Sequence, residues 1–128
     1  MPRTRKDEAP IAIDEAVITA RYADLDGYTV GYETFHTEFD PAPLFQGLPD
    51  DRCQAPHFGI VVSGRLEIRY ADSTEVYEAG DAYYCRPGHL PWPHTGCEVI
   101  EFTPTAELEA SMSVVGANMA AAGIGASA

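Results

Sequence analysis

Residues 53–101, CQAPHFGIVVSGRLEIRYADSTEVYEAGDAYYCRPGHLPWPHTGCEVIE, decide the fold of this chain. Within this stretch, residues 65–70 alternate between charged and apolar side chains, which is typical of a strand with one buried face. Ser63 and Gly64 come directly before this run and have the composition of a tight hairpin connection. Glycine, aspartate and serine recur at short intervals after it. The stretch therefore predicts several short antiparallel strands joined by tight turns.

The segments that precede and follow this stretch extend the pattern. Residues 11–23 and 28–39 are rich in β-branched and aromatic side chains, which favour strands, whereas the prolines in residues 40–54 predict a loop. Further strands are predicted over residues 57–62, 65–70, 74–78, 82–85 and 98–103. Several prolines between the last two argue against a central strand there, because proline cannot donate a hydrogen bond to its neighbour. This succession predicts an all-β sandwich or barrel.

The C-terminal segment has a different pattern. Thr105 is a suitable N-cap residue, and apolar residues at helical spacing predict one amphipathic helix over residues 106–121. The apolar stripe consists of Leu108, Met112, Val115 and Met119. Such a stripe is more typical of packing against the barrel or a second subunit than of a cofactor site. The predicted segments are a mobile arm (1–10), the barrel (11–104), the helix (105–122) and a frayed tail (123–128).

The composition argues against several classes of partner. The chain has 20 Asp and Glu against 8 Lys and Arg, a net charge of -12 that repels nucleic acid and anionic membrane surfaces. No apolar run is long enough to predict a membrane span or a secretion signal. The cysteine count of 3 is odd, and none lies in a Cys-x-x-Cys pair, which favours reduced thiols. We therefore expect a cytoplasmic protein that binds neither nucleic acid nor membranes.

Two glycine-containing motifs in the central stretch carry a family resemblance. The run GRLEIRY from Gly64, followed by EAGDAYYCRPGH with Gly80 and Gly88, resembles the cupin superfamily, although Arg86 stands where the family motif has a proline. The resemblance covers residues 56–103. It implies a small jelly-roll β-barrel with one C-terminal helix. It also implies a homodimer, since similar proteins often pair through sheet edges that need covering.

The family's metal ligands are not retained in their usual places. The resemblance puts two histidines and a glutamate before Gly64, and these places hold Asp51, Cys53 and His57. The place of the later histidine holds Pro91, and the nearest histidines to it are His89 and His94. Most of these places therefore carry residues that are able to bind a metal, but in a different register from the family's.

Two interpretations of these residues stay open. In one, Cys53, His57 and either His89 or His94 hold one divalent ion at the barrel mouth and leave a coordination position free. Cysteine and histidine ligands favour zinc, while imidazoles with a carboxylate such as Asp51 also suit iron, nickel or copper. In the other interpretation the site is lost, no metal is bound, and the histidines are hydrogen-bonded structural residues.

Aromatic residues predict a pocket for a small organic ligand. The predicted pocket residues are Tyr32, His36, Phe58, Tyr84 and Trp92. Prolines on both sides of Trp92 stiffen the backbone that presents it. The same aromatic side chains are equally suited to the barrel core.

Two functions therefore remain. The first is a metal-dependent enzyme that acts on a small organic substrate. The second is a metal-free, non-catalytic module that binds a small ligand or a partner. The sequence lacks the nucleotide-binding, nucleophile-elbow and zinc-protease motifs that would point elsewhere. A fold alone does not choose between the two, because one fold hosts unrelated chemistries.

Overall fold

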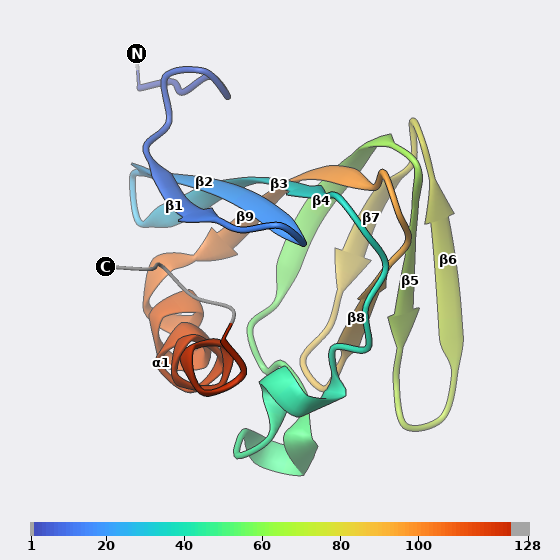
Figure 1. Cartoon of the computed structure of the whole chain (residues 1–128). Coiled ribbons are helices and arrows are strands. Elements are labelled where there is room, and N and C mark those ends of the chain that lie inside the picture. The colour runs from blue at the N-terminus through green and yellow to red at the C-terminus, as the bar shows by residue number, and fades with distance from the viewer. Residues whose placement is uncertain (1, 124–128) are drawn as a thin grey trace.

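Two antiparallel sheets face each other in the computed structural model, which describes residues 2–123, and one helix lies beside them (Figure 1). The strands are β1 (Ile11–Asp14), β2 (Ile18–Leu25), β3 (Tyr28–Phe35), β4 (His57–Ser63), β5 (Arg65–Arg69), β6 (Thr74–Glu78), β7 (Ala82–Cys85), β8 (Leu90–Pro93) and β9 (Glu98–Pro104). Two short 3-10 turns, η1 (Ala42–Phe45) and η2 (Pro49–Asp51), precede β4, and the helix α1 (Thr105–Ala121) follows β9. The larger sheet has the order β1-β2-β3-β9-β4-β7, and the smaller has the order β6-β5-β8. The predicted all-β jelly-roll barrel with one C-terminal helix is confirmed.

The central stretch forms the strands that its alternation predicts. On β5, Leu66 and Ile68 are 2% and 1% exposed and belong to the main core between the sheets. On β4, the side of His57 and Val61 points inward, while the side of Phe58 points to solvent. Gly64 connects β4 to β5 with a φ of 73°, and a Cβ there would lie 2.8 Å from the backbone of Cys97. Glycine is therefore required at this turn.

Two segments differ from the prediction. Residues 11–23 form two strands, β1 and most of β2, because a turn intervenes in which the Glu15 N–H donates to the Ile18 carbonyl at 2.9 Å. Residues 90–93 form a strand, β8, despite Pro91 and Pro93. This strand lies at the edge of the smaller sheet, where a proline removes no hydrogen bond from an inner strand.

Helix α1 begins one residue earlier than predicted, at Thr105. The N-cap position belongs to Pro104, and the hydroxyl of Thr105 instead hydrogen-bonds that of Thr29 at 2.9 Å. At its other end, the Asn118 amide donates to the carbonyls of Leu44 and Gln46 at 2.8 Å each. These bonds attach the helix to the loop before β4. None of the helices in residues 2–123 has the length and apolar character needed to span a membrane.

The two ends of the chain were predicted to be mobile. Within the described residues, a turn in the first segment brings the Ala9 N–H to the Arg5 carbonyl at 3.0 Å, and Ala9 is buried against Val30 and Tyr32. The predicted frayed tail lies outside the described residues from position 124 on, so its mobility stays a prediction.

Candidate functional site

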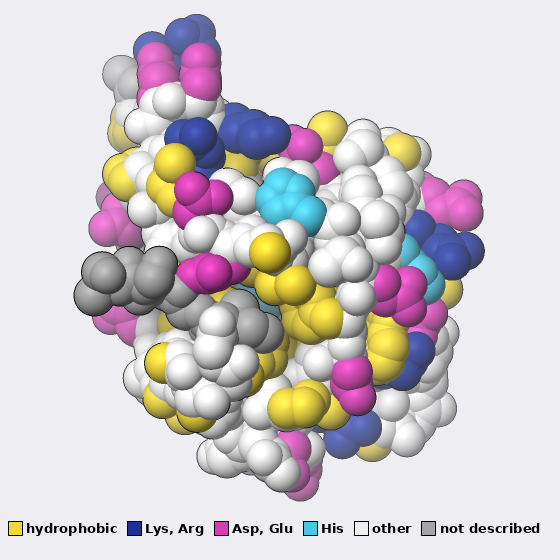
Figure 2. Space-filling model, in the orientation of Figure 1, with side chains coloured by type: hydrophobic (Ala, Val, Ile, Leu, Met, Phe, Trp, Pro, Cys, Tyr) yellow, Lys and Arg dark blue, Asp and Glu magenta, His cyan; other side chains and the backbone are white. Residues whose placement is uncertain are grey.

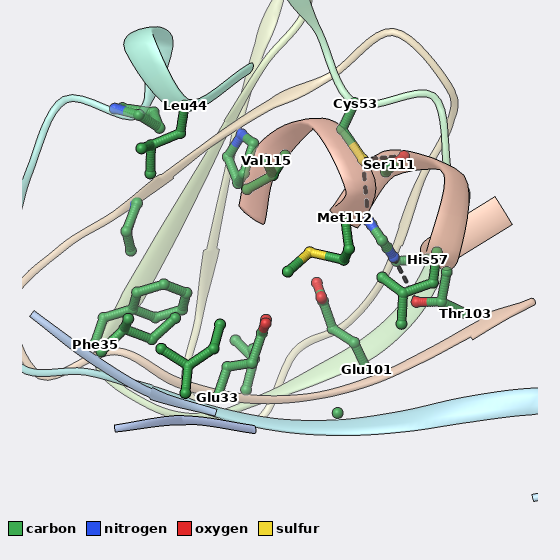
Figure 3. A pocket seen from close by; sticks show the side chains of 18 of the residues that line it. Glu33, Phe35, Leu44, Cys53, His57, Glu101, Thr103, Ser111, Met112 and Val115 are labelled. Atoms are coloured by element: carbon green, nitrogen blue, oxygen red, sulfur yellow. Dashed lines mark hydrogen bonds between the residues drawn. The ribbon is translucent and has the colours of Figure 1, made fainter. Parts of the chain in front are cut away.

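A cavity of about 130 Å³ lies inside the barrel, lined by residues of both sheets and of α1 (Figure 3). Its wall is largely apolar, and the helix contributes Leu108, Ser111, Met112, Val115 and Met119. The predicted stripe of the helix therefore covers the cavity. On the face of the molecule beside the helix, hydrophobic side chains gather near the centre (Figure 2). Two groups of polar side chains interrupt the apolar wall.

The first polar group consists of Cys53, His57 and His89, all buried on the cavity wall. Cys53 precedes β4 and His57 begins it, so one short segment presents both. His89 comes from the turn before β8, and a backbone bridge ties it to Cys53: the Cys53 N–H donates to the His89 carbonyl at 2.8 Å. Residues far apart in the sequence are thereby fixed side by side.

Hydrogen bonds orient both imidazole rings. Nδ1 of His89 lies 2.7 Å from the carbonyl oxygen of Arg86, which can only accept, so Nδ1 carries the proton and Nε2 keeps its lone pair. Nδ1 of His57 lies 2.6 Å from the Thr103 hydroxyl, and its Nε2 lies 3.6 Å from the sulfur of Cys53 (Figure 3). Partners of this kind are the outer contacts that orient metal-binding histidines in proteins.

Of the distances among these donors, the one from Cys53 to His57 has the value expected for two ligands of one ion. One ligand atom from each of the three side chains lies within 4.8 Å of the other two. Two ligands of a tetrahedral zinc, a sulfur at about 2.3 Å and a nitrogen at about 2.05 Å, are separated by about 3.6 Å. The Cys53 to His57 distance of 3.6 Å matches that value. Catalytic zinc is held by three protein ligands drawn from histidine, cysteine and carboxylate side chains, which leave a fourth position free.

Burial sets the protonation of this group. It lowers the pKa of His57 and of His89 to about 4, so both imidazoles are neutral near pH 7, which is the form that binds metals. It raises the pKa of the Cys53 thiol to about 11. A metal ion at this place must therefore displace the thiol proton.

The second polar group is a pair of carboxyls, Glu33 and Glu101, that point from the larger sheet into the cavity below Met112 (Figure 3). The Tyr22 hydroxyl donates to Oε2 of Glu33 at 2.7 Å, and the Tyr83 hydroxyl donates to Oε2 of Glu101 at 2.6 Å. Each carboxyl thus has its own tyrosine. Burial, then the charge of Glu101, raises the pKa of Glu33 to about 7, and burial also raises the pKa of Glu101.

Glycines make room for both tyrosines. One row of paired residues crosses five strands of the sheet in the order Tyr22, Gly31, Glu101, Gly59, Tyr83. A Cβ on Gly31 would lie 2.9 Å from the Tyr22 ring. A Cβ on Gly59 would lie 2.6 Å from the Tyr83 ring. Each tyrosine therefore lies across a glycine to reach its carboxyl.

His94, a predicted metal ligand, does not join the Cys53, His57 and His89 group. It follows β8, whereas His89 precedes it, and its ring lies near Glu38 and Glu67 at 3.1 and 3.4 Å. Asp51 is exposed in η2, and its carboxylate accepts the N–H of Gly47. Of the sequence-derived ligand set, the structure brings Cys53, His57 and His89 together.

The predicted pocket residues lie outside the cavity, which corrects the sequence interpretation. Phe58 and Tyr84 are 61% and 45% exposed on the outer face of the larger sheet, with ring centroids 4.7 Å apart. Tyr32 is buried, but in a separate cluster with Ala9 and Val30.

His36 is exposed after β3, where its Nε2 pairs with the Thr19 hydroxyl. Trp92 lies under the guanidinium of Arg69 and donates to Glu38. Strand alternation groups residues by face but leaves open which face turns inward.

The cavity carboxyls and their tyrosines were not predicted. The alternation of residues 28–39 does place Gly31, Glu33 and Phe35 on one face. A glutamate in a strand ordinarily faces solvent, so the sequence alone does not predict this face as the interior. The signal that was present is the glycine on the same face, because a glycine inside a strand often marks a close approach of another group.

Solved structures with similar folds identify the architecture. No family model matches the sequence, and a search of curated proteins found no match. The polyketide cyclase RemF from Streptomyces resistomycificus is 15% identical, with a TM-score of 0.55 over 81% of this chain and 79% of that one. An RmlC-like cupin from Shewanella frigidimarina is 14% identical, with a TM-score of 0.52 over 79% of this chain and 88% of that one. KdgF from Halomonas sp. is 15% identical, with a TM-score of 0.50 over 78% and 92%. The chain therefore has the cupin fold.

Proposed function

We propose that this chain of cupin fold is an enzyme for a small organic molecule and that it holds one divalent metal ion, of the zinc class, through Cys53, His57 and His89. The observation that supports this most strongly is the position of the three donors on the wall of the cavity. A thiol among the donors favours zinc over iron, which is more often bound by imidazoles and carboxylates.

Each residue has a distinct part in this proposal. The carbonyl of Arg86 holds the ring of His89 with Nε2 free to coordinate. The Thr103 hydroxyl lies 2.6 Å from Nδ1 of His57, and when it accepts the Nδ1 proton, Nε2 of that ring is free to coordinate. The apolar wall excludes water and takes up the hydrocarbon part of the ligand. A bound ion of this class supplies Lewis-acid polarisation of a substrate oxygen.

The alternative is a metal-free barrel that binds a small ligand without catalysis. It is favoured by one observation: the Cys53 thiol, protonated because its pKa is raised to about 11, has a partner in Nε2 of His57. The group is thus hydrogen-bonded without an ion. The cytoplasmic location stays a prediction that agrees with either function, since all three cysteines are free thiols.

Metal analysis separates the two functions. Protein purified without an affinity tag should contain about one equivalent of a transition metal, and Cys53→Ser or His57→Ala should retain less than about a tenth. His94→Ala is the matched control, because His94 lies outside the group, and it should keep full occupancy. The readout is elemental analysis by mass spectrometry, with circular dichroism to verify folding. A wild type that is metal-free and takes up neither zinc nor iron would establish the metal-free alternative.

The orientation of His57 offers a second, graded test. Thr103→Val removes the hydroxyl that lies 2.6 Å from Nδ1 and leaves the three donors intact. Loss of such an outer contact typically lowers metal affinity 10- to 100-fold. A competition titration with a chromophoric zinc chelator measures the change. Ser113→Ala, on the exposed side of α1, serves as the control and should leave the affinity unchanged.

A further inference from the structure

We propose that Glu33 and Glu101 share one proton and act as a proton-transfer pair on a small, neutral carbonyl compound bound in the cavity. The proposal rests on the small-molecule function of the cavity, but it does not depend on whether a metal is bound. It gives a role to the polar group that the proposed metal site does not use.

The geometry of the pair is built by four strands. Tyr22 of β2 holds Glu33 of β3, and Tyr83 of β7 holds Glu101 of β9. Both tyrosines lie across glycines that leave no space for a Cβ. Each carboxyl is thus held by its own tyrosine, and the two come from paired strands, where Gly31 lies opposite Glu101 and Glu33 is two residues further along β3. Each tyrosine uses Oε2, which leaves an oxygen of each carboxyl for its neighbour and for a ligand.

The pair is suited to hold a single proton near neutral pH. The pKa of Glu33 is raised to about 7 by burial and then by the charge of Glu101, and burial also raises the pKa of Glu101. Two carboxylates in such surroundings do not both ionise readily, because each disfavours the charge of the other. The other titratable groups acting on the pair are the two tyrosines, which stay neutral, and His57, also neutral. An acid and a base therefore lie side by side in the cavity wall.

The cavity selects the class of ligand. None of the described residues that line it is a lysine or an arginine. In the metal-free protein an anionic ligand would meet the carboxylate without a compensating cation, which is costly in an apolar site. A protonated carboxyl is instead a good donor to a carbonyl oxygen. An apolar cavity of about 150 Å³ accommodates benzene, so a volume of about 130 Å³ suits a molecule with one small ring.

The step is an internal hydrogen shift in the substrate. Glu33 gives its proton to the carbonyl oxygen, while the carboxylate of Glu101 takes a proton from the carbon next to the carbonyl. The C–H electron pair becomes the new C=C bond, and the C=O π pair moves to oxygen as the O–H bond forms. The product is the enol isomer, and no oxidant or reductant is needed. The proton on Glu101 then returns to Glu33 on the paired strand, which restores the pair.

The protonation state is tested first, without any substrate. Carbon-13 labelling of the glutamate side chains allows each carboxyl to be titrated by NMR in the zinc-free and zinc-loaded protein. In the wild type we expect one carboxyl to titrate with a midpoint of about 7. This titration should be absent in Glu33→Gln, and its midpoint should fall by at least about one pH unit in Glu101→Gln. Glu98 lies on β9 with Glu101 but outside the cavity, so Glu98→Gln is the control and should leave this titration midpoint unchanged. A wild type in which every carboxyl titrates below about pH 5.5 overturns the shared proton.

Proton transfer is tested with cyclohexanone as the probe. In D₂O, wild-type protein should exchange the hydrogens next to the carbonyl faster than buffer does, as measured by proton NMR. The exchange rate should be at least tenfold lower in Glu33→Gln and in Glu101→Gln than in the wild type, since general acid–base groups contribute about 100-fold or more. Cyclohexanecarboxylate, a charged molecule of similar size, should not bind to the zinc-free protein in saturation-transfer NMR.

The outcomes separate this proposal from the proposed function. Exchange that persists after zinc removal supports the pair whatever the metal analysis gives. Binding of cyclohexanone without exchange overturns proton transfer but leaves the small-molecule cavity in place. Failure of cyclohexanone to bind, or binding of the carboxylate instead, overturns the assignment of a neutral carbonyl ligand.

Discussion

At the scale of single residues, the position of a histidine relative to one short strand decides its chemistry. His89 and His94 stand on either side of β8, which carries the chain about 13 Å from one end to the other. His89 thereby meets Cys53 and His57 inside the barrel, whereas His94 remains among surface carboxylates. Sequence spacing placed His89 two residues before the family's ligand position at Pro91 and His94 three residues after it, so the strand between them had to distinguish the two.

The buried histidines predict how stability depends on pH. In the folded protein the pKa of each is about 4, against about 6.5 in an unfolded chain. Between these values the folded state binds fewer protons, so each histidine makes the unfolding free energy rise with pH, and the gain is lost as pH falls. The raised pKa of Glu33 acts in the opposite direction between about 4.3 and 7.

His89→Gln isolates one of these contributions. With EDTA present, the rise in unfolding free energy between pH 4 and 6.5 should be smaller than in wild type by roughly 2 to 3 kcal/mol. Urea unfolding at several pH values gives this difference. The exposed His36 provides the control, since His36→Gln should keep the wild-type slope. Parallel pH profiles for His89→Gln and wild type would show that burial does not perturb this histidine.

At the scale of elements, local patterns predicted some strands and missed others for identifiable reasons. β5 was predictable because its alternation and its burial coincide. β8 was not predictable from its sequence. Its prolines are tolerated because it lies at the edge of a sheet, and that position is known only once the sheet is assembled. The inward face of β3 depends in the same way on its neighbours. The fold could therefore be inferred from the sequence, while the cavity wall required the register between strands.

Gly59 tests whether that register builds the cavity. In Gly59→Ala the new Cβ would lie 2.6 Å from the Tyr83 ring and 3.0 Å from the Ile100 carbonyl, so the tyrosine must leave Glu101. We expect a loss of about 1 to 3 kcal/mol in unfolding free energy. Gly116→Ala in α1 is the matched control, because nothing lies within 4 Å of its Cβ position. It should stabilise the helix by about 0.5 to 1 kcal/mol. Equal unfolding free energies for the two variants would mean that the sheet around Gly59 rearranges without loss of stability.

At the scale of the whole molecule, the barrel has an apolar face that no element within residues 2–123 covers. The residues exposed there by 38% to 61% are Phe58, Ile60 and Val62 of β4, Tyr84 of β7 and Phe102 of β9. A patch of this kind beside an open sheet edge commonly marks a contact between proteins. β7 ends the order of the larger sheet, so the patch and the edge are adjacent. A second copy of the chain, related by a two-fold axis, would cover both with the same residues.

The homodimer predicted from the sequence can therefore be tested at this face. We expect the wild type to sediment as a dimer at micromolar concentrations and Ile60→Asp to sediment as a monomer, because the charge would be buried without a partner. Val76→Asp is the matched control: Val76 is 49% exposed, close to the 46% of Ile60, but lies on β6 of the other sheet. It should remain dimeric. Analytical ultracentrifugation measures all three. A monomeric wild type would rule out the dimer, and dissociation by Val76→Asp alone would move the interface to the smaller sheet.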